Sequence, residues 1–475
     1  MKHQRSLCVS FLLAAGATGA LAQSGATASA DKPVFAVNGD FRFRYEAYDS
    51  AYTLNSDAAG HHRGYFRARL RLWETVNLAP DLTLFGRVSA EPRNWLQAPV
   101  AAAPTYGPEW KYAIVDDLYA KWTGDAAGTP VAVIVGRQDI QLGDQWLVGD
   151  GTPLDGSWTN HFDGLRATFD AKSIKTKFEV IAFDQQACPG DRLPVLGLNR
   201  DAANKKYLLQ EQDETGFIAY ASNKSIKNVQ LDGYFMYKGD DAVSSVISTK
   251  GYNADVYTLG ARIAGTPEEH WQYSAEGAYQ WGRRNDASGR FSAANNFAAT
   301  GDLSRDVSAY GGIAKVTYLF KDSLNNQLTF STEYLSGDKD GTGAKDEMFD
   351  ILWGRTPRIS EVWAVAIGQE TGRNAQYANL FRVGASWSIA PSKNTSISAS
   401  YNALFAPNQV PTRNRASALF SHDSSFRGHE LQVVLKQKFT KQLSGLVLAE
   451  YCPMGDFYTN TDAMTFLRAE MLFTF

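Results

Sequence analysis

The chain has 475 residues, with 47 Lys or Arg against 50 Asp or Glu, so its formal net charge is −3. Hydrophobic residues make up 44 % and aromatic residues 12 %, a composition that excludes a disordered chain, and 3 Cys are too few for a disulfide scaffold. The near-neutral charge excludes the strongly basic class of nucleic-acid-binding proteins. The mean hydropathy of −0.31 is too low for a bundle of membrane helices, so the many aromatic residues need another explanation. Length alone, at about 150 residues per domain, suggests three domains.

Residues 1–22 have the features of a signal peptide. Lys2 and Arg5 precede a short apolar stretch, and Ala20-Leu21-Ala22 fits the small-x-small cleavage pattern. A buried N-terminal helix is the alternative. Residues 23–33, rich in Ser, Gly and Ala, are predicted to be a disordered start of the mature chain. We therefore expect export across a bacterial inner membrane, to the periplasm, the exterior or the outer membrane.

Alternation of charged and apolar residues begins soon after this segment. In residues 40–47, Arg42, Arg44 and Glu46 alternate with Phe41, Phe43 and Tyr45. In residues 64–76, three arginines alternate in the same way with Phe66, Ala68, Leu70 and Leu72. A period of two with charges on one face indicates strands that have one wet face and one apolar face.

Eighteen such strands are predicted. They span residues 34–47, 64–76, 82–90, 112–122, 130–138, 161–170, 175–184, 213–222, 227–238, 253–265, 270–282, 304–319, 326–336, 378–390, 395–406, 426–438, 443–455 and 463–475. The connections alternate between short and mostly long, as in outer-membrane barrels with short periplasmic turns and long extracellular loops. A soluble sandwich also alternates polar and apolar residues, but it has no reason to sort its loops by parity. Residues 34–475 are therefore expected to form one transmembrane antiparallel β-barrel, in which the aromatic residues form interface girdles.

The predicted lumen-facing positions are rich in arginine. A barrel of this size is wide enough for a water-filled channel, and guanidinium groups in it would attract anions. In the alternative interpretation these arginines pair with lumenal Glu46, Glu179, Glu430 and Glu470 and only stiffen the wall. Arg137 shares its parity with three valines, so its strand needs an irregularity to turn it inward. The predicted lumenal residues are Arg42, Arg44, Arg67, Arg69, Arg71, Arg137, Arg166, Arg262, Arg382, Arg468, Glu430 and Glu470.

The long connection 337–377 is the candidate for a loop that constricts the lumen, through Trp353, Arg355, Arg358 and Trp363. An ordinary surface loop is the alternative. Asp338, Asp340 and Asp346 form a weak candidate for a Ca²⁺ site, although their spacing does not fit an EF-hand and a solvated acidic loop explains them better. No other metal site and no cofactor are expected.

The two cysteines outside the predicted signal peptide, Cys188 and Cys452, are candidates for a disulfide in an oxidising compartment. At the C-terminus, residues 463–475 alternate strictly and end in Phe475, which is typical of the signal read by the outer-membrane barrel-assembly machinery.

The chain contains a series of short motifs: Arg67-Ala68-Arg69-Leu70-Arg71, Gly136-Arg137-Gln138-Asp139, Gly143-Asp144, Trp158-Thr159-Asn160, Phe162-Asp163-Gly164-Leu165-Arg166, Gly337-Asp338, Gly428-His429-Glu430-Leu431 and Pro453-Met454-Gly455-Asp456-Phe457-Tyr458. In their order and spacing these motifs resemble the alginate-export family of outer-membrane barrels. The resemblance implies an eighteen-stranded barrel with an electropositive pore for the uronate polymer alginate, and it implies substrate contacts at Arg67, Arg69, Arg137 and Arg166. The long gating loop of the family's exporters has no counterpart in the short joints 391–394 and 439–442, which puts gated export in doubt.

We therefore expect an outer-membrane channel that passes anionic saccharides, alginate or a similar uronate polymer or oligomer, with membrane lipid around it and no nucleic-acid partner. A porin for small anionic or neutral nutrients is the alternative. An outer-membrane enzyme would need a nucleophile beside a histidine, for which His422 with Ser421 or Ser424 is the only loose candidate; no catalytic residues are therefore expected. A structural or adhesive barrel is the fourth interpretation.

Overall fold

The computed structural model describes residues 35–97, 107–109, 112–149, 162–188, 193, 195–197, 212–242, 253–285, 304–339, 345–412 and 417–475. The predicted signal peptide 1–22 and the predicted disordered segment 23–33 lie outside these residues.

In the described part of the chain, eighteen long antiparallel strands form a closed barrel. They are β1 (Phe35–Asp49), β2 (His62–Ala79), β3 (Leu82–Ala90), β6 (Tyr112–Ala126), β7 (Thr129–Gln138), β8 (Phe162–Ala171), β9 (Thr176–Gln185), β11 (Gln212–Asn223), β12 (Val229–Ala242), β13 (Asn253–Gly265), β14 (Trp271–Asn285), β15 (Arg305–Leu319), β16 (Gln327–Leu335), β18 (Leu380–Ser392), β19 (Thr395–Phe405), β20 (Phe426–Lys438), β21 (Leu443–Cys452) and β22 (Met464–Thr474). All eighteen predicted strands are confirmed, with ends that differ by at most four residues.

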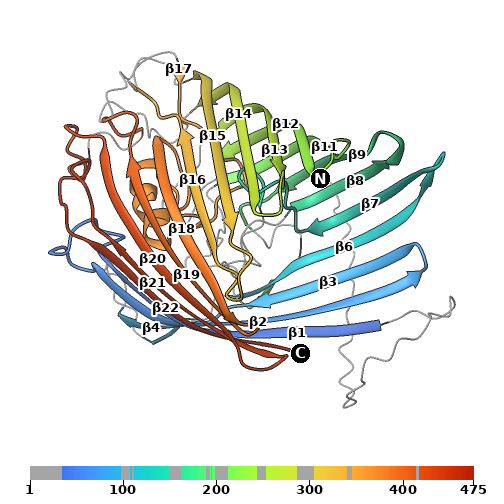
Figure 1. Ribbon diagram of the computed structural model, residues 1–475, viewed down its shortest axis with the longest axis horizontal. Coiled ribbons are helices and arrows are strands. Elements are labelled where there is room, and N and C mark those ends of the chain that lie inside the picture. The colour runs from blue at the N-terminus through green and yellow to red at the C-terminus, as the bar shows by residue number, and fades with distance from the viewer. Residues whose placement is uncertain are drawn as a thin grey trace, which may run out of the picture. The chain divides into compact units, whose positions relative to one another are not determined.

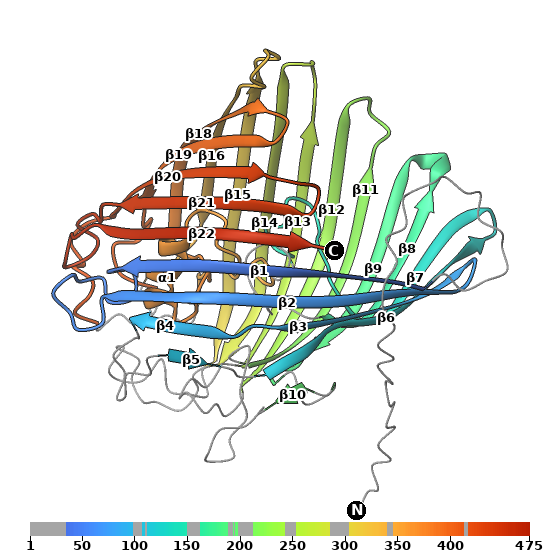
Figure 2. The same ribbon diagram turned by 90° about the horizontal axis from the view of Figure 1, so that it is seen from below.

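The barrel closes where the first strand meets the last. Strand β1 pairs with β2 on one side and with β22 on the other, so that Arg44 lies opposite Glu470. Figure 2 shows β22 and β1 side by side, with the remaining strands following in chain order around the wall. Closure leaves no strand edge unpaired in the wall, which is what a sheet in a bilayer requires.

Smaller elements lie in or beside the connections. They are the short strands β4 (Arg93–Gln97), β5 (Gly107–Glu109), β10 (Val195–Gly197) and β17 (Lys345–Asp346), the 3₁₀ turn η1 (Lys172–Ile174) and the helix α1 (Glu361–Thr371). Among the described residues, no helix is both long enough and apolar enough to span a membrane.

The two ends of the barrel differ in their connections. At one end, called here the short-turn end, strands are joined by few residues, such as 127–128 and 393–394. At the other, the long-loop end, the connections include 139–161 and 336–379. The predicted sorting of loop lengths by parity is therefore present.

The two faces of the wall differ as the alternation predicts. Large apolar side chains such as Phe41, Leu70 and Leu431 are exposed on the outer face, whereas their sequence neighbours Arg42, Arg69 and Glu430 are buried inside. An outward apolar band and an inward polar surface are the arrangement of a transmembrane barrel.

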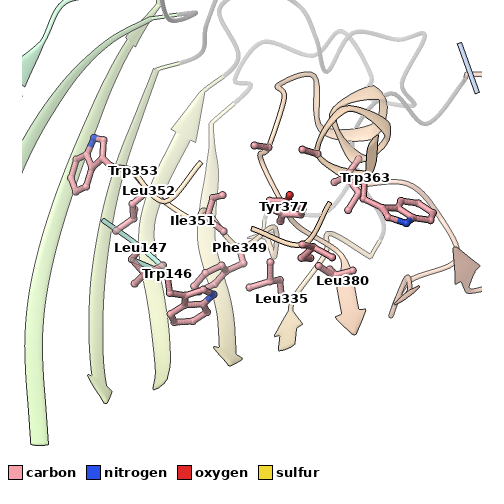
Figure 3. Packing of buried hydrophobic residues seen from close by; sticks show 14 of the residues in the cluster. Trp146, Leu147, Leu335, Phe349, Ile351, Leu352, Trp353, Trp363, Tyr377 and Leu380 are labelled. Carbon is pink, nitrogen blue, oxygen red and sulfur yellow. The ribbon is translucent and has the colours of Figure 1, made fainter. Parts of the chain in front are cut away.

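The buried apolar cluster lies mainly inside the barrel and not between layers. Figure 3 shows Trp146 and Leu147 from one connection meeting Phe349, Ile351, Leu352 and Trp353 from another, with Trp363 and Tyr377 further along the same segment. Trp146 and Phe349 stack with ring centroids 5.4 Å apart. Figure 1 shows α1 behind the wall formed by β18 to β20. Two long connections thus fold back into the lumen and pack on each other.

Candidate functional site: the lumen

The predicted arginines on β1, β2 and β22 face the lumen, and each contacts a carboxylate. Glu46 is fully buried and holds Arg468 at 2.5 Å, with Arg44 and Arg67 at 3.5 Å. Arg44 also pairs with Glu470. These contacts link neighbouring strands, because Arg44 and Glu46 lie on β1 and Arg67 on β2.

A second group of contacts continues along the same strands. Asp40 is the partner of Arg71, through Nε at 2.8 Å, and of Arg69 at 3.4 Å. Glu91 lies 2.6 Å from Arg67 and 3.7 Å from Arg42. The structure therefore places six arginines of β1, β2 and β22 in a ladder of ion pairs, which is the geometry of the stiffening interpretation.

The remaining predicted wall residues also have partners. Arg166 pairs with Glu179 at 2.5 Å, and Arg382 donates to Asn402 at 2.6 Å. Glu430 accepts hydrogen bonds from Ser400 at 3.1 Å and from Asn402 at 2.5 Å.

Arg137 is held by Asp163 at 2.6 Å and by the Val115 carbonyl at 2.8 Å. The residue before it, Gly136, has a φ of +124°, and a Cβ there would lie 2.2 Å from the Leu118 carbonyl oxygen. The backbone of β7 is thus irregular next to Arg137, at the place where the simple alternation broke down, and only glycine fits that conformation.

The predicted constriction residues lie inside the barrel, on the connection between β16 and β18. Arg355 pairs with Glu214 of β11 at 3.0 Å, and Arg358 pairs with Glu333 of β16 at 2.5 Å. Trp353 and Trp363 are fully buried. The segment is therefore an inward-folded loop and not a surface loop.

Two anchors fix this loop to opposite parts of the wall. Asp350 lies 3.4 Å from Lys238 of β12 and 3.7 Å from Arg284 of β14. On another part of the wall, Glu450 of β21 accepts hydrogen bonds from the Glu361 and Val362 amides at the N-terminus of α1, at 3.0 and 3.2 Å. A carboxylate at a helix N-terminus meets both unpaired amides and the positive end of the helix dipole.

The second inward loop is the connection after β7. Trp146 donates from Nε1 to Glu333 at 2.9 Å, and Val148 forms a bridge with Trp353. At its tip, Asp144 contacts Arg262, Ser274 and Lys315 on β13, β14 and β15. This loop starts at the long-loop end and reaches strand positions only three or four residues from the short turns.

Two of the three acidic residues of the weak Ca²⁺ candidate form ion pairs with arginines in the structure. Asp338 pairs with Arg305 and Asp346 with Arg284, each at 2.7 Å, while Asp340 lies outside the described residues. Cys188 and Cys452 are both buried, and among the described residues no disulfide joins them. Ser421 donates to the Asp456 carbonyl and Ser424 accepts from the Phe426 amide at 3.1 Å, which are turn contacts beside His422.

Basic residues gather in two adjoining cavities at the short-turn end. The first has a volume of about 740 Å³ and the second about 460 Å³, and both are lined by Lys224, Gln230 and Arg262. Only two acidic residues, Asp170 and Glu179, line either cavity. The basic lining residues are Arg166, Lys172, Lys175, Lys177, Lys224, Lys227, Arg262 and Lys315.

The sequence interpretation included Arg166 and Arg262 but missed the lysines. A signal for them exists, because the tetrapeptide Lys-Ser-Ile-Lys occurs at residues 172–175 and again at 224–227. Both copies lie in short turns, and the two turns are adjacent: the Lys224 amide donates to the Lys175 carbonyl at 2.9 Å. The repeat therefore places four lysines on one side of the barrel mouth.

Comparison with solved structures defines the class of fold. The chain is similar to OccK8 (OprE) of Pseudomonas aeruginosa, with a TM-score of 0.53 and 11 % identity over 93 % of this chain and 98 % of that one. It is also similar to a BenF-like porin of Pseudomonas fluorescens Pf-5, with a TM-score of 0.54 and 12 % identity over 93 % of this chain and 98 % of that one. A third similar structure is Pseudomonas aeruginosa OccK2 (OpdF) in complex with glucuronate, with a TM-score of 0.51 and 11 % identity over 93 % of this chain and 97 % of that one. The fold is that of porin-like outer-membrane barrels.

The family follows from the sequence. A family model described as alginate export matches residues 39–470, and the chain belongs to this family. A search of curated proteins gave no match. Family and fold together place the protein in the outer membrane as a channel, and in such barrels the short turns face the periplasm.

Proposed function

We propose that this protein is an outer-membrane channel for anionic saccharides that carry uronate carboxylates. The observation that carries the proposal is the pair of basic cavities at the short-turn end, where lysines remain exposed to water. Lys177 and Lys315 contact Glu179 and Asp144, but their side chains are about half exposed, at 46 % and 48 %. The arginines near the barrel closure differ in that their ion pairs are almost wholly shielded from water. Exposed cations in a concave polar surface raise the local concentration of anions.

The inward loops bear on the size of the solute. Loop 336–379 is anchored to β12 and β14 by Asp350 and to β21 by Glu450, so it crosses the lumen rather than lining one side. Passage of a wide polymer would require these anchors to open. The family favours alginate or a similar uronate polymer, while the anchored loop favours uronate monomers and oligomers; the second candidate is thus a porin for small uronates. A neighbour in fold was crystallised with glucuronate.

Other parts of the chain serve export, assembly and the shape of the solute path in this proposal. Residues 1–22 direct export, and Phe475, whose side chain is half exposed at the end of the wall, is the residue that the assembly machinery reads. The lumenal arginines Arg42, Arg67, Arg69 and Arg71 shape the path, while Arg166 and Arg262 contact the solute.

Purified protein in planar bilayers tests the proposal. We expect anion selectivity in a KCl gradient, and in liposomes a faster uptake of glucuronate than of glucose. The double variant Lys177→Gln/Lys224→Gln should lose most of this preference. Arg283→Gln is the matched control, because Arg283 is exposed on the outer rim of β14 and pairs only loosely with Asp306, at 3.5 Å. Cation selectivity, or equal rates for glucuronate and glucose, would refute the proposal.

The size of the solute is tested separately. Liposomes loaded with alginate fragments of increasing length should release short fragments and retain long ones if the loop stays anchored. Release without regard to length would favour the polymer channel instead.

A further inference from the structure

At the tip of the loop that follows β7, the carboxylate of Asp144 is surrounded by hydrogen-bond donors from the barrel wall. Asp144 Oδ1 accepts from Arg262 at 2.6 Å, and Oδ2 accepts from Ser274 Oγ at 2.7 Å and lies 2.9 Å from Lys315 Nζ. The donors come from three neighbouring strands, and Ser274 and Lys315 are direct cross-strand partners. Two cations and a hydroxyl around one carboxylate are what a binding site for a uronate carboxylate would need.

The donors belong to the wall and not to the loop, so they stay in place whatever the loop does. All three line the cavity of about 460 Å³, a volume within the roughly 300–1,000 Å³ range of small-molecule sites. Arg262 is held from its other side by Asp232 at 2.9 Å, and its Nε has no hydrogen-bond partner among the described residues. The guanidinium is thus pre-oriented, with Nε buried and the two terminal nitrogens directed at Asp232 and Asp144.

The loop is shaped to reach this place. Gly143 has a φ of +56°, and a Cβ there would lie 3.3 Å from Arg262 Cδ and 3.3 Å from Tyr220 Oη. A glycine lets the backbone turn and approach the wall closely, which delivers the next side chain to the donors.

The ion pair between Asp144 and Lys315 lies at the end of the loop that is accessible to water. The Asp144 side chain is 24 % exposed and that of Lys315 48 %, whereas Trp146, two residues further on, is buried against Phe349. Asp144 can therefore leave the donors without the apolar part of the loop moving.

We propose that Arg262, Ser274 and Lys315 form a carboxylate-binding site in the lumen, which Asp144 fills as a tethered stand-in until a uronate carboxylate replaces it. The exchange swaps one carboxylate for another on the same donors, so Arg262 keeps two carboxylate partners and Lys315 keeps one throughout passage. Such a site would favour carboxylates over neutral sugars. This inference rests on the proposed function and names the residues at which its solute binds.

A tethered competitor lowers the apparent affinity for a free ligand, because only the fraction of molecules with a vacated site binds it. In planar bilayers carrying KCl current, glucuronate added on the short-turn side should block Asp144→Ala at a concentration about tenfold lower than the wild type. Asp144→Asn keeps the size of the side chain but removes its charge, and it should shift the block in the same direction by less. Lys315→Gln, a change of an exposed side chain that the fold tolerates, should raise the blocking concentration above the wild-type value. Glucose is the neutral probe and Arg283→Gln the control variant.

The outcomes separate this inference from the proposed function. If Asp144→Ala is blocked at the wild-type concentration or above, or if Lys315→Gln leaves the block unchanged, the carboxylate site is refuted even though glucuronate passes. If glucuronate neither blocks nor permeates the wild type while KCl current flows, the proposed function fails first.

Discussion

The lumen has two regions that are both rich in basic residues and that use them in opposite ways. Near the barrel closure, on β1, β2 and β22, arginines are buried and each contacts a carboxylate, as Arg468 contacts Glu46 at 2.5 Å. At the short-turn end of β8 to β15, lysines and arginines surround two cavities, and Glu179 and Asp144 each contact a half-exposed lysine there, Lys177 and Lys315.

The difference shows that the role of a basic residue in the lumen cannot be inferred from its residue type alone. Its carboxylate partners and its exposure to water must also be known. A buried guanidinium in a full set of ion pairs is costly to disturb, because its partner would be left charged in a low-dielectric surrounding. An exposed ammonium is hydrated, contributes little to stability and is open to a solute. The closure region is therefore expected to carry stability, and the short-turn region transport.

The largest effect should come from Glu46→Gln. This change leaves Arg44, Arg67 and Arg468 without their shared carboxylate, and breaking a buried pair typically costs about 3–5 kcal/mol. The free energy of unfolding in detergent, measured by guanidinium titration, should fall by about that amount. The matched control is Asp306→Asn, whose ion pair with Arg283 is exposed and should be worth less than about 1 kcal/mol. Equal stability of the two variants would show that the buried pairs are not structural.

A smaller and more local effect is expected for Asp350→Asn. It removes the charge that faces Lys238 and Arg284, and a buried donor left without its partner costs about 1–3 kcal/mol. Hydrogen exchange of residues 345–355 should increase, and single-channel conductance should rise as the loop detaches. Faster exchange without a change in conductance would mean that this anchor does not limit the path.

The ion pairs of Asp350 with Lys238 and Arg284 also predict how the loop responds to acid. Burial raises the pKa of Asp350, but the charges of Lys238 and Arg284 outweigh it and hold that pKa well below its usual value. The stabilisation is therefore fully present above the unfolded pKa of about 4 and is lost only as the pH falls through the lower folded value. Between pH 7 and about 4.5, protonation of Asp350 should therefore cause no change in the conductance of the wild type.

The sequence predicted the wall far better than what fills it. Alternation and loop parity located all eighteen strands, because each strand must place polar residues inside and apolar ones outside. Loop 336–379 carries no such repeat, so only its tryptophans and arginines marked it as a constriction. The pairing of Arg67 with Glu91, or of Asp144 with Lys315, joins residues that alternation sorts to the lumen without saying which of them meet. The four lysines of the repeated Lys-Ser-Ile-Lys were missed because they lie in turns, where alternation no longer applies, whereas Lys177 and Lys315 lie on β9 and β15.

A loss of about 1 kcal/mol is expected for Ser360→Ala. Ser360 Oγ accepts from the Trp363 amide at 3.2 Å and donates to Glu450 at 2.6 Å, so it caps α1 and joins it to the wall. Ser360→Thr, which retains the hydroxyl, should restore most of the loss. The readout is the rate of limited proteolysis within 355–375, and an unchanged rate for the alanine variant would show that Glu450 alone secures the helix.

The smallest effect on stability, within about 0.5 kcal/mol, is expected for Lys177→Gln/Lys224→Gln, because the two exposed side chains bury little. Their effect on selectivity should instead depend on salt. Screening lengths fall from about 10 Å at 0.1 M to about 3 Å at 1 M salt, so wild-type anion preference should weaken steeply over that range. The variant should show a weak preference at every concentration, converging with the wild type at 1 M. If instead the closure arginines set selectivity, the wild-type preference would persist at 1 M, since buried pairs are poorly screened, and the double variant would match it; that result would reverse the roles assigned to the two regions.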